Sequence, residues 1–287
     1  MKRSQQYALH SPSSSYAEEC ESMNPVDEGV QKRLTQLGPF PEEKRKEYDG
    51  LYQDLPVLGP FKYKNGMTYL GQFKGGQRTG FGTLVFADGS VYEGYFKNGQ
   101  SEGFGRLVLK DGCSCSGEWK AGKKHGWCSF VDLDGNKCIG EYKNDHPDGC
   151  SLLKQTNGGI FVEEWKKGKR NGWSCTIFSD GETSTAEYKG GEKDGWCFLV
   201  KPNGNKYIGG YQEGAKHGWG YEEYLSRGVK KICEYNEGKI VWGSIENSNG
   251  AIYVGEWKDK KRCGWGFYQH LDGRKYTGEY QNGLRHG

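Results

Sequence analysis

The residues of this 287-residue chain that are best suited to chemistry are its histidines and cysteines. His125, His217 and His286 each stand immediately before a glycine of a 23-residue repeat. If every repeat is a β-hairpin, neighbouring repeats lie about 10 Å apart, so these histidines cannot converge on one substrate. The sequence contains no Walker loop, no HExxH motif and no G-x-S-x-G motif. We therefore predict no enzyme activity, no catalytic residue and no cofactor.

The cysteines were considered as metal ligands or disulfide partners. Cys113, Cys115, Cys128 and Cys138 lie close together in the sequence, but no C-x-x-C pair is present to begin a zinc site. Cys115 and Cys138 hold equivalent positions in adjacent hairpins, so we expect a separation of about 10 Å, beyond the ~7 Å Cα limit for a disulfide. We predict that these thiols pack as small apolar groups and that there is no metal site.

Basic residues gather at the turns between the two strands of each predicted hairpin. The candidate edge for an anionic partner comprises Lys123, Lys124, Lys167, Lys169, Arg170, Lys260, Lys261 and Arg262. Aspartates such as Asp88 and Asp111 occupy the turns at the opposite ends. This basic edge either keeps the protein soluble or binds a lipid headgroup or an acidic protein. The net charge of only +3 does not favour nucleic acid as a partner.

A 23-residue repeat positions all of these side chains. One column is glycine, at Gly80, Gly103, Gly126, Gly149, Gly172, Gly195, Gly218, Gly264 and Gly287, and it is interrupted at Val241. A second column is aromatic: Phe73, Phe96, Trp119, Tyr142, Trp165, Tyr188, Tyr211, Trp257 and Tyr280. A third holds Phe81, Phe104, Trp127, Cys150, Trp173, Trp196, Trp219, Trp242 and Trp265. The spacing slips by one residue before Gly228 and then recovers, so we predict that residues 221–250 are the weakest part of the array.

Each repeat has the pattern of two short strands. Tyr69, Gly71 and Phe73 alternate with Leu70 and Gln72, as in a strand with two unlike faces. Glycine weakens a strand unless a neighbour must approach closely, so we expect the large rings to lie over the glycines. The predicted fold is all-β: an elongated single-layer array of about ten consecutive β-hairpins, roughly one for each repeat.

The repeat pattern Y-x-G-x-(aromatic)-x-x-G-x-x-x-G-(aromatic)-G resembles the MORN repeat (membrane occupation and recognition nexus). The repeats that begin at Tyr69, Tyr92, Tyr253 and Tyr276 match best, whereas those from Cys115 to Lys206 are degraded. The resemblance implies a twisted solenoid sheet, as in ciliary radial-spoke head proteins and cytoskeletal scaffolds of this family. Family members with kinase or methyltransferase activity carry it in separate domains, and no such domain is visible here.

The amino-terminal segment lacks the repeat. Residues 1–26 are serine-rich and predict a disordered tail. Residues 27–58 are expected to form one or two short helices, the second with Pro41 in its first turn. This segment is either a cap on the first edge of the sheet, a partner-binding helix, or disordered like the tail. The MORN-repeat array is expected over residues 59–287.

The last strand is a candidate partner site. It comprises Tyr276, Thr277, Gly278, Glu279 and Tyr280, and we expect the sequence to end at Gly287 before a returning strand can form. An unpaired strand edge accepts a further strand. We therefore expect either a blunted edge, or the addition of a partner strand or of the same strand from a second copy, which would give a homodimer.

Two functions remain open at this stage. The first is a non-enzymatic scaffold or adaptor that positions protein partners in a ciliary or cytoskeletal assembly, with a cytoplasmic location in the cilium, axoneme or cytoskeleton. The second is a peripheral membrane tether that binds anionic phospholipid through the basic edge. The ciliary placement is implied by the family resemblance and by no individual residue.

Overall fold

The computed structural model describes residue 35 and residues 38–286, so the predicted tail at 1–26 lies outside the described residues. The chain divides into two compact units, one ending at Thr156 and the other beginning at Asn157. In the first unit, helix α2 (Glu42–Tyr52) lies within the predicted 27–58 segment. It is followed by β1 (Val57–Lys62), β2 (Thr68–Lys74), β3 (Gln77–Val85), β4 (Val91–Lys97), β5 (Gln100–Val108), β6 (Ser114–Lys120), β7 (Lys123–Val131), β8 (Lys137–Lys143) and β9 (His146–Lys154).

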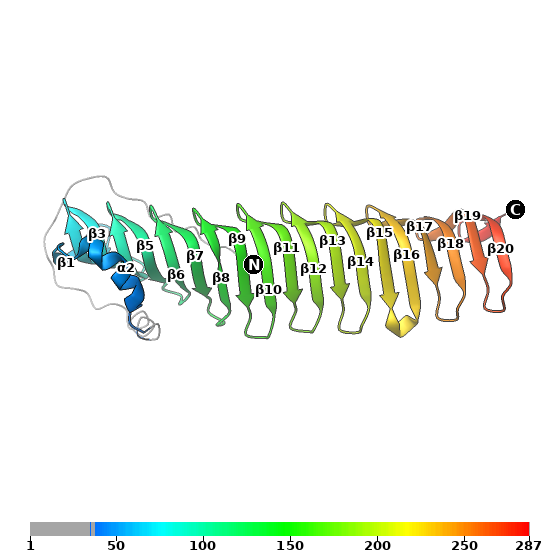
Figure 1. Ribbon diagram of the computed structural model, residues 1–287, viewed down its shortest axis with the longest axis horizontal. Helices are drawn as coiled ribbons and strands as arrows, with labels where there is room; N and C mark the ends of the chain where they lie inside the picture. Colours follow the sequence, from blue (N-terminus) through cyan, green and yellow to red (C-terminus); the bar gives the residue numbers. More distant parts are fainter. Residues whose placement is uncertain (1–34, 36–37, 287) are drawn as a thin grey trace. The chain divides into compact units, whose positions relative to one another are not determined.

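The second unit repeats the same plan (Figure 1). Its elements are β10 (Ile160–Lys166), β11 (Lys169–Ile177), β12 (Thr183–Lys189), β13 (Glu192–Val200), β14 (Lys206–Gln212), β15 (Ala215–Tyr224), η1 (Leu225–Arg227), β16 (Val229–Asn236), β17 (Lys239–Glu246), β18 (Ile252–Lys258), β19 (Lys261–Gln269), β20 (Lys275–Gln281) and β21 (Leu284–His286). Within each unit every strand pairs antiparallel with its neighbours in the chain, as β4 does with β3 and β5. The predicted all-β hairpin array is confirmed.

Tight two-residue turns close the hairpins. Asn98-Gly99 and Lys167-Gly168 have positive φ at both positions, which is the type I′ geometry that matches the right-handed twist of paired strands. The turns of successive hairpins are also joined, since the N–H of Gly122 donates to the carbonyl of Ser101 at 2.9 Å. The hairpins therefore follow one another in a fixed register.

The periodic glycine lies in a β-bulge of each regular hairpin. Between the pairs Gly94↔Gly105 and Phe96↔Ser101, the second strand contains two more residues than the first. Gly103 lies in this bulge with a φ of +76°, a conformation that favours glycine over residues with a side chain. The bulge in the slipped repeat has only one extra residue, between Glu234↔Trp242 and Tyr235↔Ile240. This smaller bulge compensates for the slip, and its Val241 is not among the residues of positive φ.

The core lies on one face of the sheet, here called the tyrosine face, which carries Tyr69, Gly71 and Phe73 of β2 with Gly82 of β3. A Cβ added at Gly82 would lie 2.6 Å from Tyr69 Cζ, so the ring covers the glycine as predicted. Tyr69 Oη donates to the carbonyl of Gln72 at 3.1 Å, and Tyr92, Tyr207, Tyr253 and Tyr276 make the same bond to the carbonyl three residues on. Burial raises the pKa of Tyr253 to about 12, so its hydroxyl remains a neutral donor.

The degraded repeats conserve volume on this face. In the regular repeats a tyrosine faces a glycine, as Tyr92 faces Gly105. In the next repeat Cys115 and Cys128 occupy these two positions and are both buried. The later degraded repeats hold Cys138 with Ser151, Phe161 with Ser174, and Ser184 with Cys197. In these four repeats the leading tyrosine is lost and a residue larger than glycine stands at the second position, as close packing favours filling the space.

Candidate functional site: the tryptophan face

The face opposite the tyrosines carries the third column of the sequence pattern and is here called the tryptophan face. In the second unit its row of indoles remains exposed: Trp173 49%, Trp196 60%, Trp219 51%, Trp242 38% and Trp265 63%. Apolar side chains of neighbouring strands widen this row, among them Val162, Phe198 and Ile208. A contiguous exposed apolar stripe of this kind marks an interaction surface.

Periodic glutamates hold the backbone of the tryptophan row. The N–H of Trp173 donates to Glu164 Oε2 at 3.1 Å, and the N–H of Trp265 donates to Glu256 Oε1 at 3.1 Å. A Cβ at Gly172 would collide with Glu164, so the bulge glycine leaves the space that the carboxylate occupies. These glutamates support the bulges and are also exposed to solvent.

In the first unit the chain covers the beginning of its tryptophan face, whereas Trp127 of the same column remains 51% exposed. Phe40 contacts Phe81 and Phe104 with ring centroids 4.9 and 5.6 Å away, both edge-to-face. Arg106, whose side chain is 6% exposed, forms an ion pair with Glu93 and donates from Nη1 to the carbonyl of Gly38 at 2.8 Å. The residues around Phe40 are thus anchored by both ring packing and hydrogen bonds.

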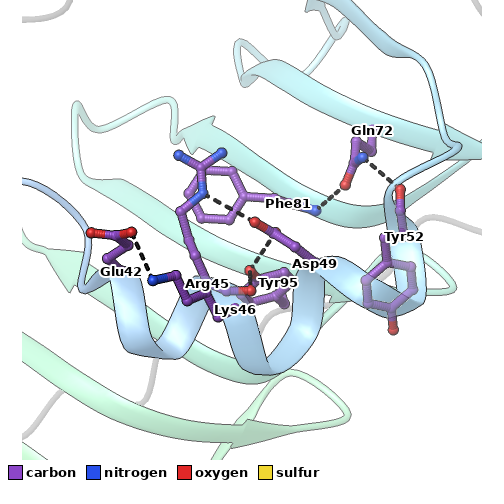
Figure 2. Close-up of polar contacts among 8 residues, drawn as sticks. All are labelled: Glu42, Arg45, Lys46, Asp49, Tyr52, Gln72, Phe81 and Tyr95. Carbon is purple, nitrogen blue, oxygen red and sulfur yellow. Dashed lines mark hydrogen bonds and ion pairs between the residues drawn. The ribbon is translucent and has the colours of Figure 1, made fainter.

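Helix α2 extends this cover (Figure 2). Tyr95 Oη donates to Asp49 Oδ1 at 2.8 Å, and Gln72 Nε2 donates to the carbonyl of Tyr52 at 2.8 Å. The guanidinium of Arg45 lies 4.8 Å from the centroid of Phe81. Tyr95 is only 1% exposed beneath the helix. The predicted 27–58 segment thus places a helix over the face of the first hairpins, and this contact involves residues that the sequence pattern did not single out.

The aromatic residues of the second column lie on the tyrosine face, as predicted. They pack against the leading tyrosines, and Phe96 lies 5.1 Å from Tyr92 in an edge-to-face contact. Phe96, Trp119 and Tyr280 are buried. Phe73, Tyr142, Trp165, Tyr188, Tyr211 and Trp257 are half-buried. Their role in the structure is packing, and the exposed aromatic surface belongs to the third column instead.

The basic residues of the candidate edge separate into two groups. Lys124, Arg170 and Arg262 are half-buried and lie over rings of the tyrosine face, with Lys124 Nζ 4.9 Å from the centroid of Tyr142. Arg170 also forms an ion pair with Glu163 at 2.7 Å. The exposed group at the hairpin turns is Lys123, Lys167, Lys169, Lys260 and Lys261. The part of the basic edge that faces solvent is therefore smaller than the sequence pattern indicated.

A further cation of the tyrosine face belongs to a charge network. Lys216 Nζ lies 4.1 Å from the ring centroid of Tyr207 and forms an ion pair with Glu222. Burial raises the pKa of Glu222, but its hydrogen bond to Lys216 and the positive charges of Lys216 and Lys231 together outweigh burial and lower that pKa below 4.5. The carboxylate therefore stays ionised at neutral pH.

The three histidines of the repeat lie in strands rather than in turns, and the four clustered cysteines are buried or half-buried. His125 and His217 lie in β7 and β15, which belong to different units, and His286 lies in β21. The Cys115 thiol donates a hydrogen bond to Cys128 and is buried, and both effects raise its pKa, which disfavours its thiolate. In the part of the chain that the structure describes, no group of three or more His, Cys, Asp or Glu residues could hold a metal ion.

The carboxy-terminal edge differs from the prediction. A short returning strand, β21, pairs with β20 through Glu279↔His286, Tyr280↔Arg285 and Gln281↔Leu284. Glu279 and Tyr280 of the candidate site are therefore already paired on this side, whereas Tyr276, Thr277 and Gly278 have no partner in β21. The expectation that no returning strand forms is wrong, because the Asn282-Gly283 turn has the left-handed geometry that closes a hairpin within three further residues.

Three solved structures illustrate the comparison with known folds. The TCP10 domain of CPAP from Danio rerio is 11% identical, covers 79% of this chain and 99% of its own, and has a TM-score of 0.36. The TCP domain of SAS-4 from Drosophila melanogaster was solved with a proline rich motif of Ana2. It is 11% identical, covers 55% of this chain and 85% of its own, and has a TM-score of 0.33. Virginiamycin B lyase from Staphylococcus aureus is 11% identical, covers 80% of this chain and 86% of its own, and has a TM-score of 0.16. Similarities this weak carry no argument about function.

The sequence comparison is more specific. The comparison with curated proteins found no match. The MORN repeat family matches residues 69–91, 92–114, 115–137, 253–273 and 276–287, which include the repeats that resemble the family pattern best. Between the matched segments the structure continues the same hairpin with the same turns. These matched segments show that the chain contains MORN repeats.

Proposed function

We propose that this chain is a non-enzymatic scaffold or adaptor that positions other proteins in a ciliary or cytoskeletal assembly. The observation that supports it is the tryptophan row of the second unit, in which five indoles are 38–63% exposed. Indoles are costly to leave in water and are enriched at the centres of protein interfaces. Each indole stands on its own hairpin, so the row presents contacts at a fixed spacing. The ciliary or cytoskeletal location is supported only by the family resemblance.

The test compares the full chain with a variant that lacks the centre of the row. Trp196→Ala, Trp219→Ala and Trp242→Ala would be combined and expressed with an affinity tag in ciliated cells. We expect the wild type to locate to the axoneme or cytoskeleton and to co-purify with defined proteins at constant stoichiometry. The variant should no longer co-purify with these proteins, and its circular dichroism spectrum should match that of the wild type. Identical localisation and partners for both proteins would contradict the proposal.

A second function, membrane tethering, is favoured by the exposed lysines at the hairpin turns, Lys123, Lys167, Lys169, Lys260 and Lys261. In the described residues no helix is long and apolar enough to cross a membrane. The tether that we propose binds electrostatically, through the lysines at the turns. Each lysine near an anionic surface contributes about 1 kcal/mol, and salt weakens the attraction. Flotation with phosphatidylserine vesicles should then decrease with salt and disappear when these lysines are changed to glutamate. An absence of flotation at low salt would exclude the tether.

A further inference from the structure

The pitch of the tryptophan row constrains what can lie along it. Successive indoles from Trp173 to Trp265 stand on β11, β13, β15, β17 and β19, two strands apart each time. Strands in a sheet are about 4.8 Å apart, so the backbone positions that carry the indoles recur at about 9.6 Å. The row therefore offers five positions along a single unit at this backbone interval, and the rings of Trp219 and Trp242 lean together to 5.7 Å between their centroids. A ligand that follows the row must repeat its own contacts at about the backbone interval.

An α-helix does not repeat at this interval. At about 1.5 Å and 100° per residue, 9.6 Å of helix contains about 6.4 residues and turns through about 640°, roughly 80° short of two full turns. Its contacting side would rotate away from the row at every indole. A polyproline II segment rises about 3.1 Å per residue with three residues per turn, so one turn spans about 9.3 Å and returns to within about 10° of the same side. The spacing favours the polyproline conformation.

The chemistry of the row also suits such a segment. Proline rings pack on flat aromatic faces, and the polyproline conformation leaves its carbonyls free to accept hydrogen bonds from indole N–H groups. Phe198 and Ile208 add apolar surface beside the indoles. Trp219 and Trp242 meet edge-to-face at 5.7 Å, so these two rings stand at an angle to each other rather than lying flat together. Rings in this arrangement provide both a stacking face and an N–H donor.

The chain itself provides an example of this type of contact. In the first unit Phe40 lies between Pro39 and Pro41, and its ring contacts Phe81 and Phe104 of the same column. The backbone of this segment is held through carbonyls, since Arg106 donates to those of Gly38 and Pro39. A proline-flanked aromatic residue therefore already occupies this face where the column is covered.

We infer that the tryptophan row of the second unit binds an extended proline-rich segment of a partner protein, with a proline or an aromatic residue at every third position in contact with an indole. The inference rests on the proposed scaffold function and specifies the class of partner that the row accepts. Its ligand is a protein segment without secondary-structure hydrogen bonds of its own, bound by ring stacking and by hydrogen bonds to its carbonyls.

The experiment uses the full chain and fluorescein-labelled peptides made of Pro-Ser-Pro triplets, measured by fluorescence anisotropy. Affinity should rise several-fold with each triplet from two to five and then level off, because five triplets span the five indoles. Inserting Gly-Gly after each triplet should weaken binding at least tenfold, since the prolines then no longer recur at the pitch of the row. Trp219→Ala should also weaken binding at least tenfold.

Leu271→Ala provides the matched control, because this leucine is 74% exposed and lies outside the row. It should leave the affinity unchanged. Urea midpoints of the two variants should match the wild type, which would show that the loss in Trp219→Ala is not a loss of folding.

Three results would overturn the inference. The first is that no triplet peptide binds while a peptide copying residues 38–55 does, which would identify a helical occupant. The second is tryptophan-dependent self-association in sedimentation, which would identify a second copy. The third is peptide binding that is unchanged by Trp219→Ala. If the triplet peptides do not bind but cellular partners still depend on the row, the proposed proline-rich ligand is wrong and the scaffold function stands. If the peptides bind but no cellular partner depends on the row, the scaffold function fails instead.

Discussion

Exchanging Tyr92 and Gly105 for two cysteines tests how the repeats tolerate degradation. Gly105 faces Tyr92, and a Cβ added to it would lie 2.7 Å from Tyr92 Cε2. The ring has no room to withdraw, since Tyr92 is 1% exposed and contacts Phe96 and Trp119 edge-to-face. The following repeat carries Cys115 and Cys128 at the equivalent positions. The double variant Tyr92→Cys/Gly105→Cys therefore reproduces a pair that this fold already contains.

The magnitudes follow from the packing. Gly105→Cys forces a side chain into an occupied space and should cost about 1–3 kcal/mol of unfolding free energy. Tyr92→Cys removes a buried ring and should cost about 3–5 kcal/mol. Independent effects would add to about 6 kcal/mol, whereas in the double variant the new thiol fills part of the space left by the ring. We expect the double variant to cost about 3–4 kcal/mol, a coupling of about 2 kcal/mol.

Urea unfolding and amide exchange measure this coupling. With a slope of about 2 kcal/mol/M, a coupling of 2 kcal/mol moves the urea midpoint by about 1 M. Because repeat arrays can unfold in parts, exchange across residues 91–108 provides the local value. Gly99→Ala is the control for backbone strain, as its φ is +81° and no atom lies within 4 Å of the added Cβ. If the losses of unfolding free energy from the two cysteine substitutions simply add, the new thiol does not fill the space left by the ring and the reasoning is refuted.

Further predictions concern the helix, the charge network and the slipped repeat. Phe40→Ala should raise amide exchange across 42–52 at least tenfold and leave the sheet protected; unchanged helix exchange would show that Phe40 does not anchor it. The pKa of Glu222 is lower in the folded protein, so its stabilisation is present above pH 4.5 and is lost as the pH falls below that value. Glu222→Gln should reduce the decrease of the urea midpoint that occurs as the pH falls below 4.5. The same decrease in the variant and the wild type would contradict this prediction. Exchange should be faster across 229–246 than in the regular repeats; slower exchange there would remove the predicted weak region.

The sequence alone determined the repeat, its register and its turns. A period of 23 residues with turn glycines can form consecutive hairpins, and alternation within the strands separates the Tyr69 side from the Phe81 side. It also predicted that rings lie over glycines such as Gly82, because a glycine in a strand indicates the close approach of a neighbour. These features depend on contacts between residues close in sequence, and a local pattern is sufficient to reveal them.

Only the tertiary structure decided which surfaces remain exposed. Phe81 and Trp196 occupy the same column, yet the first is covered by Phe40 and the second is 60% exposed, because a segment from outside the repeat packs on one and not on the other. The turn cations divide in the same way: Arg262 lies over Tyr268 at 4.8 Å, whereas Lys261 meets solvent. Burial depends on which residues, distant in the sequence, pack against a position. Long side chains such as arginine can also fold back over any of several neighbouring residues. The period of a repeat contains neither kind of information.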